Sequence, residues 1–304
     1  MEIVDLHLHE PGPVLPWDDV SESIRDRLLH EVLLQMIDSV GVGAVVLNPV
    51  SSWGFATAAV ASDPRRFAIV KTLYATGAGR AGAIITDDVE AADIRDRIIA
   101  ASEEPGVIAT RVLFHPSVPE ELDRYHRGGY DRVFGTCDEI GLPVRFYAAD
   151  NLDAVASIAQ RWPNLQLVVD HLGISQPPLH DTDSPQWLNL PKVVSLAQYP
   201  NIALQVTAPG SLSNESYPYK DVWPHVAELL NTFGPDRMAW ASDISRFRGR
   251  VGFTHTVAHA LDDYAGKHNY MEAVAFWLYH PQLSESEKTK ILGATTRALF
   301  NWPA

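Results

Sequence analysis

The sequence predicts an α/β protein of the (β/α)8 TIM-barrel class with a C-terminal helical extension, and three observations support this prediction. Short β-branched or apolar runs alternate with longer segments of helical period along the whole chain. Eight such runs can be counted, which is the number of strands that closes a parallel barrel. The chain has 304 residues, and we expect residues 1–304 to form a single domain.

The predicted strands lie at Ile3–His9, Ala44–Pro49, Phe67–Tyr74, Val107–His115, Leu142–Ala148, Leu165–His171, Ile202–Ala208 and Met238–Asp243. Between the first two, apolar residues recur at helical spacing from Ile24 to Val40, which predicts a crossover helix with one apolar stripe. Weaker helical patterns occupy Asp87–Ala101, Pro119–Gly141, Leu152–Trp162, Leu190–Tyr199 and Asp221–Phe233. Strands that are joined by helices pair in parallel, so the repeated unit favours a barrel.

An open, doubly wound sheet is the alternative architecture for this alternation. It is disfavoured because no glycine-rich dinucleotide-binding motif follows any predicted strand. After the last strand, residues Ile244–Ala304 are expected to form several helices, namely the eighth barrel helix and a C-terminal cover. The Pro-rich segment Ser175–Trp187 is too long for a tight connection and predicts a surface or active-site loop.

The composition excludes several classes of partner. The chain has 24 Lys and Arg residues against 38 Asp and Glu, and its formal net charge of −14 repels nucleic acids and anionic membranes. No apolar run reaches the roughly 18 residues of a membrane span. The single cysteine, Cys137, cannot form an internal disulfide and is expected to be a buried apolar residue. The first residues lack a signal-peptide pattern, so we expect a cytoplasmic protein with a small-molecule substrate. A homo-oligomeric state stays open.

The first predicted strand ends in two histidines. The alternation of a strand predicts that Asp5, His7 and His9 share one face. Val4, Leu6 and Leu8 are then expected to pack outward against helices. Because the carboxyl ends of the strands form the active face of a barrel, both imidazoles are expected at its mouth. His-x-His pairs also arise by chance or in packing, so it is the position at a strand end that favours a site.

Two further polar residues end apolar strands. His171 ends the sixth predicted strand, where a ligand at the rim would satisfy its ring nitrogens. Asp243 ends the eighth strand and follows alanines on the same face. The structural alternatives are a hydrogen bond from His171 to a loop carbonyl and an N-cap role for Asp243. Strands one and eight are neighbours in a closed barrel, so Asp243 is expected beside His7 and His9, a cluster that suits hydrolysis.

Together these residues resemble a known family. The motifs are Asp5-Leu6-His7-Leu8-His9, Val168-Val169-Asp170-His171-Leu172-Gly173, Trp240-Ala241-Ser242-Asp243 and Ala294-Thr295-Thr296-Arg297-Ala298-Leu299-Phe300. In this order they resemble the amidohydrolase-2 branch of the amidohydrolase superfamily of metal-dependent hydrolases. The most similar group holds 2-pyrone-4,6-dicarboxylate lactonase and sugar lactonases. The resemblance covers nearly the whole chain. It implies a TIM barrel that hydrolyses cyclic esters or, in sister groups, decarboxylates aromatic or muconate-like acids.

Two departures from the family pattern bear on metal binding. Tyr147 stands at the end of the fifth strand, where metal-binding members usually supply a histidine. No lysine on the fourth strand is available for a carboxylated bridge, so a binuclear centre is not expected. His7, His9 and Asp243 would still provide three protein ligands for one zinc. The resemblance to the pyrone lactonases implies catalysis without metal. A single divalent metal (zinc) and metal-independent catalysis therefore both stay open.

The leading hypothesis is a hydrolase that opens a lactone ring, with Asp243 and His171 as catalytic residues. With zinc, the metal would activate a water and Asp243 would take its proton. Without metal, Asp243 would act directly as the general base while the histidines stabilise the oxyanion. One alternative is a zinc-dependent non-oxidative decarboxylase of an aromatic or muconate-like acid. The other is a catalytically silent barrel that acts as a binding protein.

Arginines indicate the charge of the substrate. Arg111 on the fourth strand and Arg145 on the fifth lie where the resemblance implies substrate contacts, with Tyr147 nearby, and Arg246 follows the eighth strand. Guanidinium groups bind carboxylates through two hydrogen bonds, so we expect an anionic, carboxylate-bearing lactone. The alternative is that Arg111 and Arg145 pair with interior acids such as Asp5, and that Arg246 belongs to a solvated loop.

Overall fold

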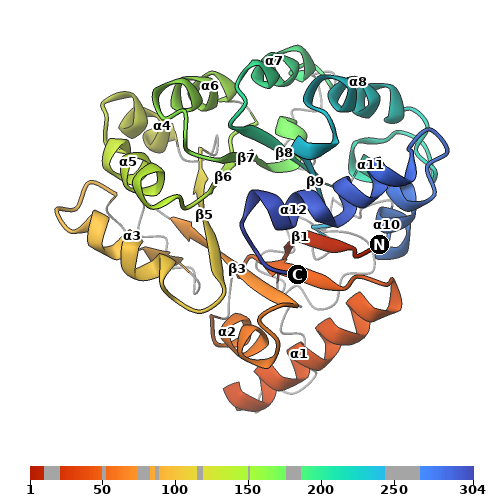
Figure 1. Cartoon of the computed structure of the whole chain (residues 1–304), viewed down its shortest axis with the longest axis horizontal. Helices are drawn as coiled ribbons and strands as arrows, with labels where there is room; N and C mark the ends of the chain where they lie inside the picture. The colour runs from red at the N-terminus through yellow and green to blue at the C-terminus, as the bar shows by residue number, and fades with distance from the viewer. Residues whose placement is uncertain are drawn as a thin grey trace.

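The computed structural model describes residues 1–9, 21–49, 53–73, 83–85, 89–114, 119–149, 151–175, 186–207, 209–243 and 268–304. In these residues, helices surround a ring of parallel strands (Figure 1). The ring contains, in spatial order, β1 (Val4–Leu8), β2 (Ala44–Leu47), β3 (Phe67–Leu73), β5 (Val107–Leu113), β6 (Val144–Tyr147), β7 (Leu167–Val169), β8 (Ile202–Thr207) and β9 (Met238–Ala241). This is the predicted TIM barrel, with a strand at each predicted position.

The order of the strands excludes the doubly wound alternative. Neighbouring strands pair in sequence order, all in parallel. The ring closes where the backbone N–H of Asp243 donates to the carbonyl oxygen of His7 over 2.9 Å. A doubly wound sheet would instead keep its first strand away from its last. The short strand β4 (Ala83–Ile85) pairs with β3 outside the ring and was not predicted.

The helices cover the outside of the ring. They are α1 (Glu22–Ser39), α2 (Trp53–Ser62), α3 (Ile94–Ser102), α4 (Pro119–His126), α5 (Asp131–Ile140), α6 (Leu152–Arg161), α7 (Leu190–Ser195), α8 (Trp223–Phe233), α10 (Tyr270–Leu278), α11 (Glu285–Thr289) and α12 (Thr295–Leu299). The single helix predicted at Pro119–Gly141 is two helices, because Gly128 between them adopts a left-handed φ of 85°. Cys137 is buried in α5, as expected. Among the described residues, no helix has the length and apolar character that crossing a bilayer requires.

The barrel interior near the amino ends of the strands is apolar and contains many small side chains. Its inward-facing residues include Ala44, Ala68, Ala109, Ala203, Ala239 and Ala241. Phe300 and Trp302, which follow α12, pack into this same cluster. The Trp302 indole donates to the carbonyl oxygen of Pro64, which precedes β3, so these rings lie at the amino ends of the strands. The described C-terminal residues thus cover the end of the barrel opposite to the predicted site. Residues 244–267 and 176–185, the latter from the predicted Pro-rich loop, lie outside the described residues.

The alternation along β1 differs from the prediction. The pairing register between β1 and β2 shifts between Asp5 and Leu8, which marks a β-bulge or similar irregularity. As a result Leu6 packs into the interior cluster, while Leu8 packs with the helices. The prediction that Asp5 shares the inward face with His7 and that Val4 and Leu6 face outward is therefore wrong. Asp5 lies instead against β9 and α10, where the Tyr270 hydroxyl donates to it over 2.8 Å.

Candidate active site

Asp243 lies between two histidines at the carboxyl ends of the barrel strands. Its carboxylate is 3.5 Å from His9 Nε2 and 4.0 Å from His171 Nδ1. The imidazole of His7 on β1 also meets that of His9, which directly follows the strand, with 3.2 Å between His7 Nε2 and His9 Nε2. The predicted clustering of Asp243 with His7 and His9 is therefore confirmed, although the roles of these residues stay predictions. All four side chains are buried within the barrel.

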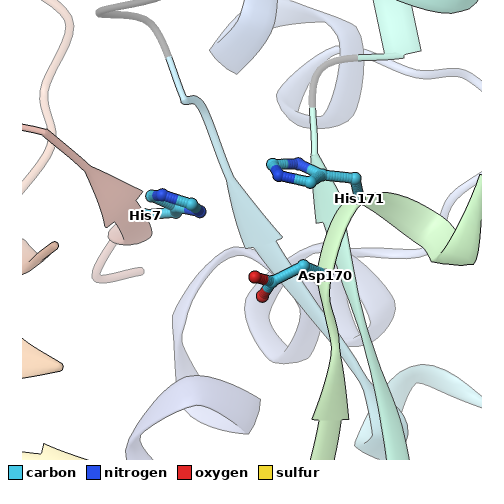
Figure 2. Close-up of side chains that lie close together, drawn as sticks. All are labelled: His7, Asp170 and His171. Carbon is cyan, nitrogen blue, oxygen red and sulfur yellow. The ribbon is translucent and has the colours of Figure 1, made fainter. Parts of the chain in front are cut away.

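His7 and His171 reach the site from different elements of the barrel. His7 comes from β1, whereas Asp170 and His171 come from the short 3-10 helix that follows β7 (Figure 2). The rings of His7 and His171 face each other with centroids 5.5 Å apart and planes 28° apart.

The backbone is strained at two positions of the site. His171 and Asp243 have left-handed φ angles of 54° and 49°. Such angles are costly for residues other than glycine and concentrate at functional sites, which supports a functional role for both residues.

Two arginines bind one buried carboxylate, that of Asp170. Arg111 Nε donates to one carboxylate oxygen over 2.7 Å, and Arg145 donates to the other from Nε and Nη2 over 3.0 and 2.8 Å. Burial alone would raise the pKa of Asp170, but the charges of Arg145 and Arg111 outweigh it and hold that pKa well below its usual range. The interior acid that pairs with the arginines is thus Asp170 and not Asp5. Asp170 was not among the predicted site residues, although a carboxylate directly before His171 at a strand end was a usable signal.

Arg145 is buried completely and holds other site residues in position. Besides Asp170, it donates to the Leu6 carbonyl oxygen over 3.3 Å and, from Nη2, to His7 Nδ1 over 2.7 Å. These bonds engage all three guanidinium nitrogens. Its predicted contact with substrate stays a prediction, and the geometry favours a positioning role.

Arg111 is placed differently from Arg145. Its only hydrogen bond to a described residue is the one from Nε to Asp170, so neither terminal nitrogen has a partner among these residues. Its guanidinium lies 5.9 Å from the ring centroid of Tyr147, and that ring meets His171 edge-on at 5.6 Å. The Tyr147 ring therefore lies beside both the Arg111 guanidinium and the His171 ring. Arg246 lies outside the described residues.

Hydrogen bonds fix the proton positions on His7 and His9. A guanidinium only donates, so His7 Nδ1 accepts from Arg145 and the neutral ring carries its proton on Nε2. His9 Nδ1 is 2.6 Å from the Asn48 carbonyl oxygen, which only accepts, so His9 is protonated on Nδ1 and its Nε2 accepts from His7. Burial and the charge of Arg145 lower the pKa of His7 well below its ordinary value of 6.5. His7 is therefore neutral at physiological pH.

The ligand atoms of His7, His9 and Asp243 lie within 4.8 Å of one another, a spacing compatible with one divalent ion. His9 also meets the usual pattern for a ligand, because its other ring nitrogen donates to a carbonyl oxygen. His7 does not, since the Arg145 bond keeps the proton on Nε2 and leaves that nitrogen no lone pair for a metal. Two ligands, His9 and Asp243, fall short of the three that a catalytic zinc normally has. In this hydrogen-bonded state the residues do not fit a metal.

A second group of potential ligand atoms contains His7, Asp170 and His171. Both oxygen atoms of Asp170 already accept hydrogen bonds from arginines. A metal at this position would add a positive charge beside two buried guanidinium groups that already compensate this carboxylate, so this group does not fit a metal either.

Part of the chain is similar to a curated enzyme. L-fucono-1,5-lactonase from Burkholderia ambifaria is 32% identical over 107 residues. The aligned segment covers 34% of this chain and 34% of that protein, so the chain aligns with about a third of the length of this curated relative.

Solved structures of similar fold cover the whole chain. An amidohydrolase from Burkholderia multivorans with bound zinc has a TM-score of 0.64 at 15% identity, with 100% of both chains covered. A proposed 2-pyrone-4,6-dicarboxylic acid hydrolase from Pseudomonas putida has a TM-score of 0.63 at 17% identity, covering 100% of this chain and 98% of that one. Such low identities show a shared fold alone.

The family assignment rests on a match along the sequence. The amidohydrolase-2 family profile, described as Amidohydrolase, matches residues 4–302. This range includes His7, His9, His171 and Asp243, as well as the C-terminal residues that cover the amino end of the barrel. The chain therefore belongs to the amidohydrolase family, as its motifs predicted.

Proposed function

We propose that the protein is a hydrolase that opens the ester bond of a lactone, with Asp243 as the general base. The observation that carries this proposal is the buried carboxylate of Asp243, 3.5 Å from His9 and 4.0 Å from His171. Both distances are long for a direct hydrogen bond, and polar groups separated in this way often share a bridging water. Family membership and the lactonase relative support the same reaction class.

In the proposed reaction, the water attacks the lactone carbonyl carbon while Asp243 accepts its proton. The carbonyl oxygen becomes an oxyanion, which a ring N–H of His171 would stabilise by a hydrogen bond. The tetrahedral intermediate then breaks its bond to the ring oxygen, and Asp243 returns the proton to the departing alkoxide. The product is a hydroxy acid, and water is the only other reactant.

The substrate in this proposal carries one anionic group. Arg145 directs its nitrogens to Asp170, His7 and the Leu6 carbonyl, so it has no free pair of donors for a substrate carboxylate. Arg111 has its two terminal nitrogens available among the described residues. One accessible guanidinium suits a single carboxylate on the lactone.

We propose further that catalysis does not need a metal, because the proton on His7 Nε2 occupies the position that a metal would need. A divalent ion, if bound, would supply polarisation of the substrate carbonyl. The test is to assay the protein before and after treatment with EDTA and dialysis. Activity should be unchanged. A loss that added zinc restores would overturn metal independence and show that the hydrolysis depends on zinc.

The proposed function is tested by assaying the purified protein on a lactone panel, with a pH indicator that reports acid release at neutral pH. The panel contains D-glucaro-1,4-lactone, D-glucono-1,5-lactone, 2-pyrone-4,6-dicarboxylate and δ-valerolactone. Hydrolysis of at least one lactone above the Asp243→Asn background supports the proposal. Silence on every lactone, or carbon dioxide release from aromatic acids, would overturn it.

A further inference from the structure

Strand β8 brings two polar side chains into the barrel that the proposed mechanism does not use. Leu204 and Val206 of β8 pack outward with the helices. Gln205 and Thr207 alternate with them, so they face the interior, and both are completely buried. The alternation Leu-Gln-Val-Thr was visible in the sequence as polar residues within an apolar strand, but it was not interpreted as part of a site.

The side-chain amide of Gln205 has a defined orientation. Its Oε1 accepts a hydrogen bond from the backbone N–H of His171 over 3.2 Å. The amide nitrogen Nε2 must therefore point elsewhere, and it has no hydrogen-bond partner among the described residues. The hydroxyl of Thr207 likewise has none in the part of the chain that the structure describes. A buried polar atom without a partner is unfavourable for folding, so such atoms usually await water or a ligand.

The two side chains lie between the predicted catalytic residues. In the pairing of β8 with β9, Gln205 is opposite Ala239 and Thr207 is opposite Ala241. Asp243 follows two residues after Ala241, on the same inward face. On the other side β8 pairs with β7, which leads directly into His171. Asn48 and Thr72 also carry buried polar atoms without partners, but only β8 runs between the strands that bear His171 and Asp243.

We infer that Gln205 and Thr207 form a subsite for a hydroxyl group on the ring of the substrate, so that the preferred substrate is a hydroxylated lactone. This inference rests on the proposed lactonase function. The amide nitrogen of Gln205 can only donate, whereas the Thr207 hydroxyl can donate or accept. A substrate hydroxyl, which accepts from Gln205 and donates to Thr207, satisfies both groups at once. A lactone without ring substituents would leave both unsatisfied and should be discriminated against.

The chain offers variants that separate this role from a structural one. Thr207→Val removes the hydroxyl at almost constant shape, and Thr207→Ser keeps it. Gln205→Glu retains the acceptor for the His171 N–H but loses the donor. Thr296 on α12 is the matched control, because its hydroxyl is also buried without a partner among the described residues, in a helix outside the barrel ring.

The experiment measures kcat/KM on D-glucaro-1,4-lactone and on 5-oxotetrahydrofuran-2-carboxylate, which carries the carboxylate but no ring hydroxyl, together with the melting temperature of each variant. We expect Thr207→Val to reduce kcat/KM at least tenfold on the hydroxylated lactone and less than twofold on 5-oxotetrahydrofuran-2-carboxylate. Its melting temperature should be unchanged or higher, because the substitution removes a buried hydroxyl that makes no hydrogen bond to the described residues of the folded protein. Thr207→Ser should retain wild-type selectivity, Gln205→Glu should lose it, and Thr296→Val should leave both rates unchanged.

Three results would overturn the inference while the proposed lactonase stands. One is an equal loss on both lactones in Thr207→Val, another is no loss on either, and the third is wild-type activity confined to lactones without a ring hydroxyl. Failure of the proposed function looks different, because the wild-type protein would then hydrolyse no lactone of the panel.

Discussion

Asp5 accepts hydrogen bonds from both the backbone N–H and the hydroxyl of Ser242, although the two residues are 237 positions apart. The same carboxylate accepts from the backbone N–H of His7 over 3.1 Å and from the Tyr270 hydroxyl. One buried side chain thus joins β1, β9 and α10 where the barrel closes. Ser242 directly precedes Asp243, so Asp5 links the backbones that carry the predicted general base and His7.

We predict that Asp5→Ala lowers the free energy of unfolding by about 3–5 kcal/mol, because it leaves two buried backbone N–H groups without acceptors. Asp5→Asn should cost less, since its oxygen can still accept from His7 and Ser242 while its amide donates to the hydroxyls. Urea unfolding of both variants measures the difference. Equal losses would contradict a role for the backbone acceptor.

The Asp170 carboxylate provides a second prediction. Arg145→Met should lower the free energy of unfolding by about 3–5 kcal/mol, because it removes one of two cations that compensate a buried negative charge. The double variant Arg145→Met, Asp170→Asn should be more stable than the single one, since the uncompensated charge is gone. Denaturant unfolding of the three proteins checks the order. A double variant less stable than Arg145→Met would exclude this charge pairing as the cause.

The general-base role gives a third prediction. Asp243→Asn should reduce kcat on a lactone substrate by a factor of about 10² to 10⁴, the usual contribution of general-base catalysis. The fold should persist, because the bond from Asp243 to the His7 carbonyl uses the backbone N–H. Asp236→Asn is a suitable control, because Asp236 is an exposed acid. It lies just before β9 and forms an ion pair with Lys290. A near wild-type rate in Asp243→Asn would remove Asp243 from the mechanism.

Stability should depend on pH through His268. Burial lowers the pKa of His268 to about 4 in the folded protein, against 6.5 for an ordinary histidine. The unfolded chain therefore binds more protons between these values, and stability falls as the pH falls from 6.5 to about 4. The loss across this window is about 3 kcal/mol. The lowered pKa of Asp170 acts in the same direction but at more acidic pH, because an aspartate in the unfolded chain binds its proton only near pH 3.8.

The pH dependence is measured by urea unfolding at several values between pH 7.5 and 4.5, on the wild type and on His268→Gln. The variant should show a shallower decline below pH 6.5, since it lacks the titrating group. The buried His7 contributes a decline of the same sign in both proteins, because its pKa is also lowered. Identical slopes in the two proteins would show that His268 does not cause the effect.

Much of the architecture could be predicted because it depends on local patterns. The strands and most helices follow from hydrophobic periodicity, and the meeting of His7 with Asp243 follows from closure of a ring of parallel strands. The break between α4 and α5 was missed because the apolar pattern continues across Gly128, whose left-handed backbone ends the helix. The short strand β4 carries too few residues to show a period.

The sequence by itself determined the barrel, the family and the residues at the strand ends, because these depend on spacing along the chain. Only the tertiary structure decided the pairing of charges. Arg111 meets Asp170 across 59 positions, a contact that requires β5 and the end of β7 to face one barrel interior. The tertiary structure also decided the direction of the Asp5 side chain, because the irregular register of β1 changes the alternation of its side chains. It decided the protonation of His7 as well, because Arg145 donates to the His7 ring from another strand.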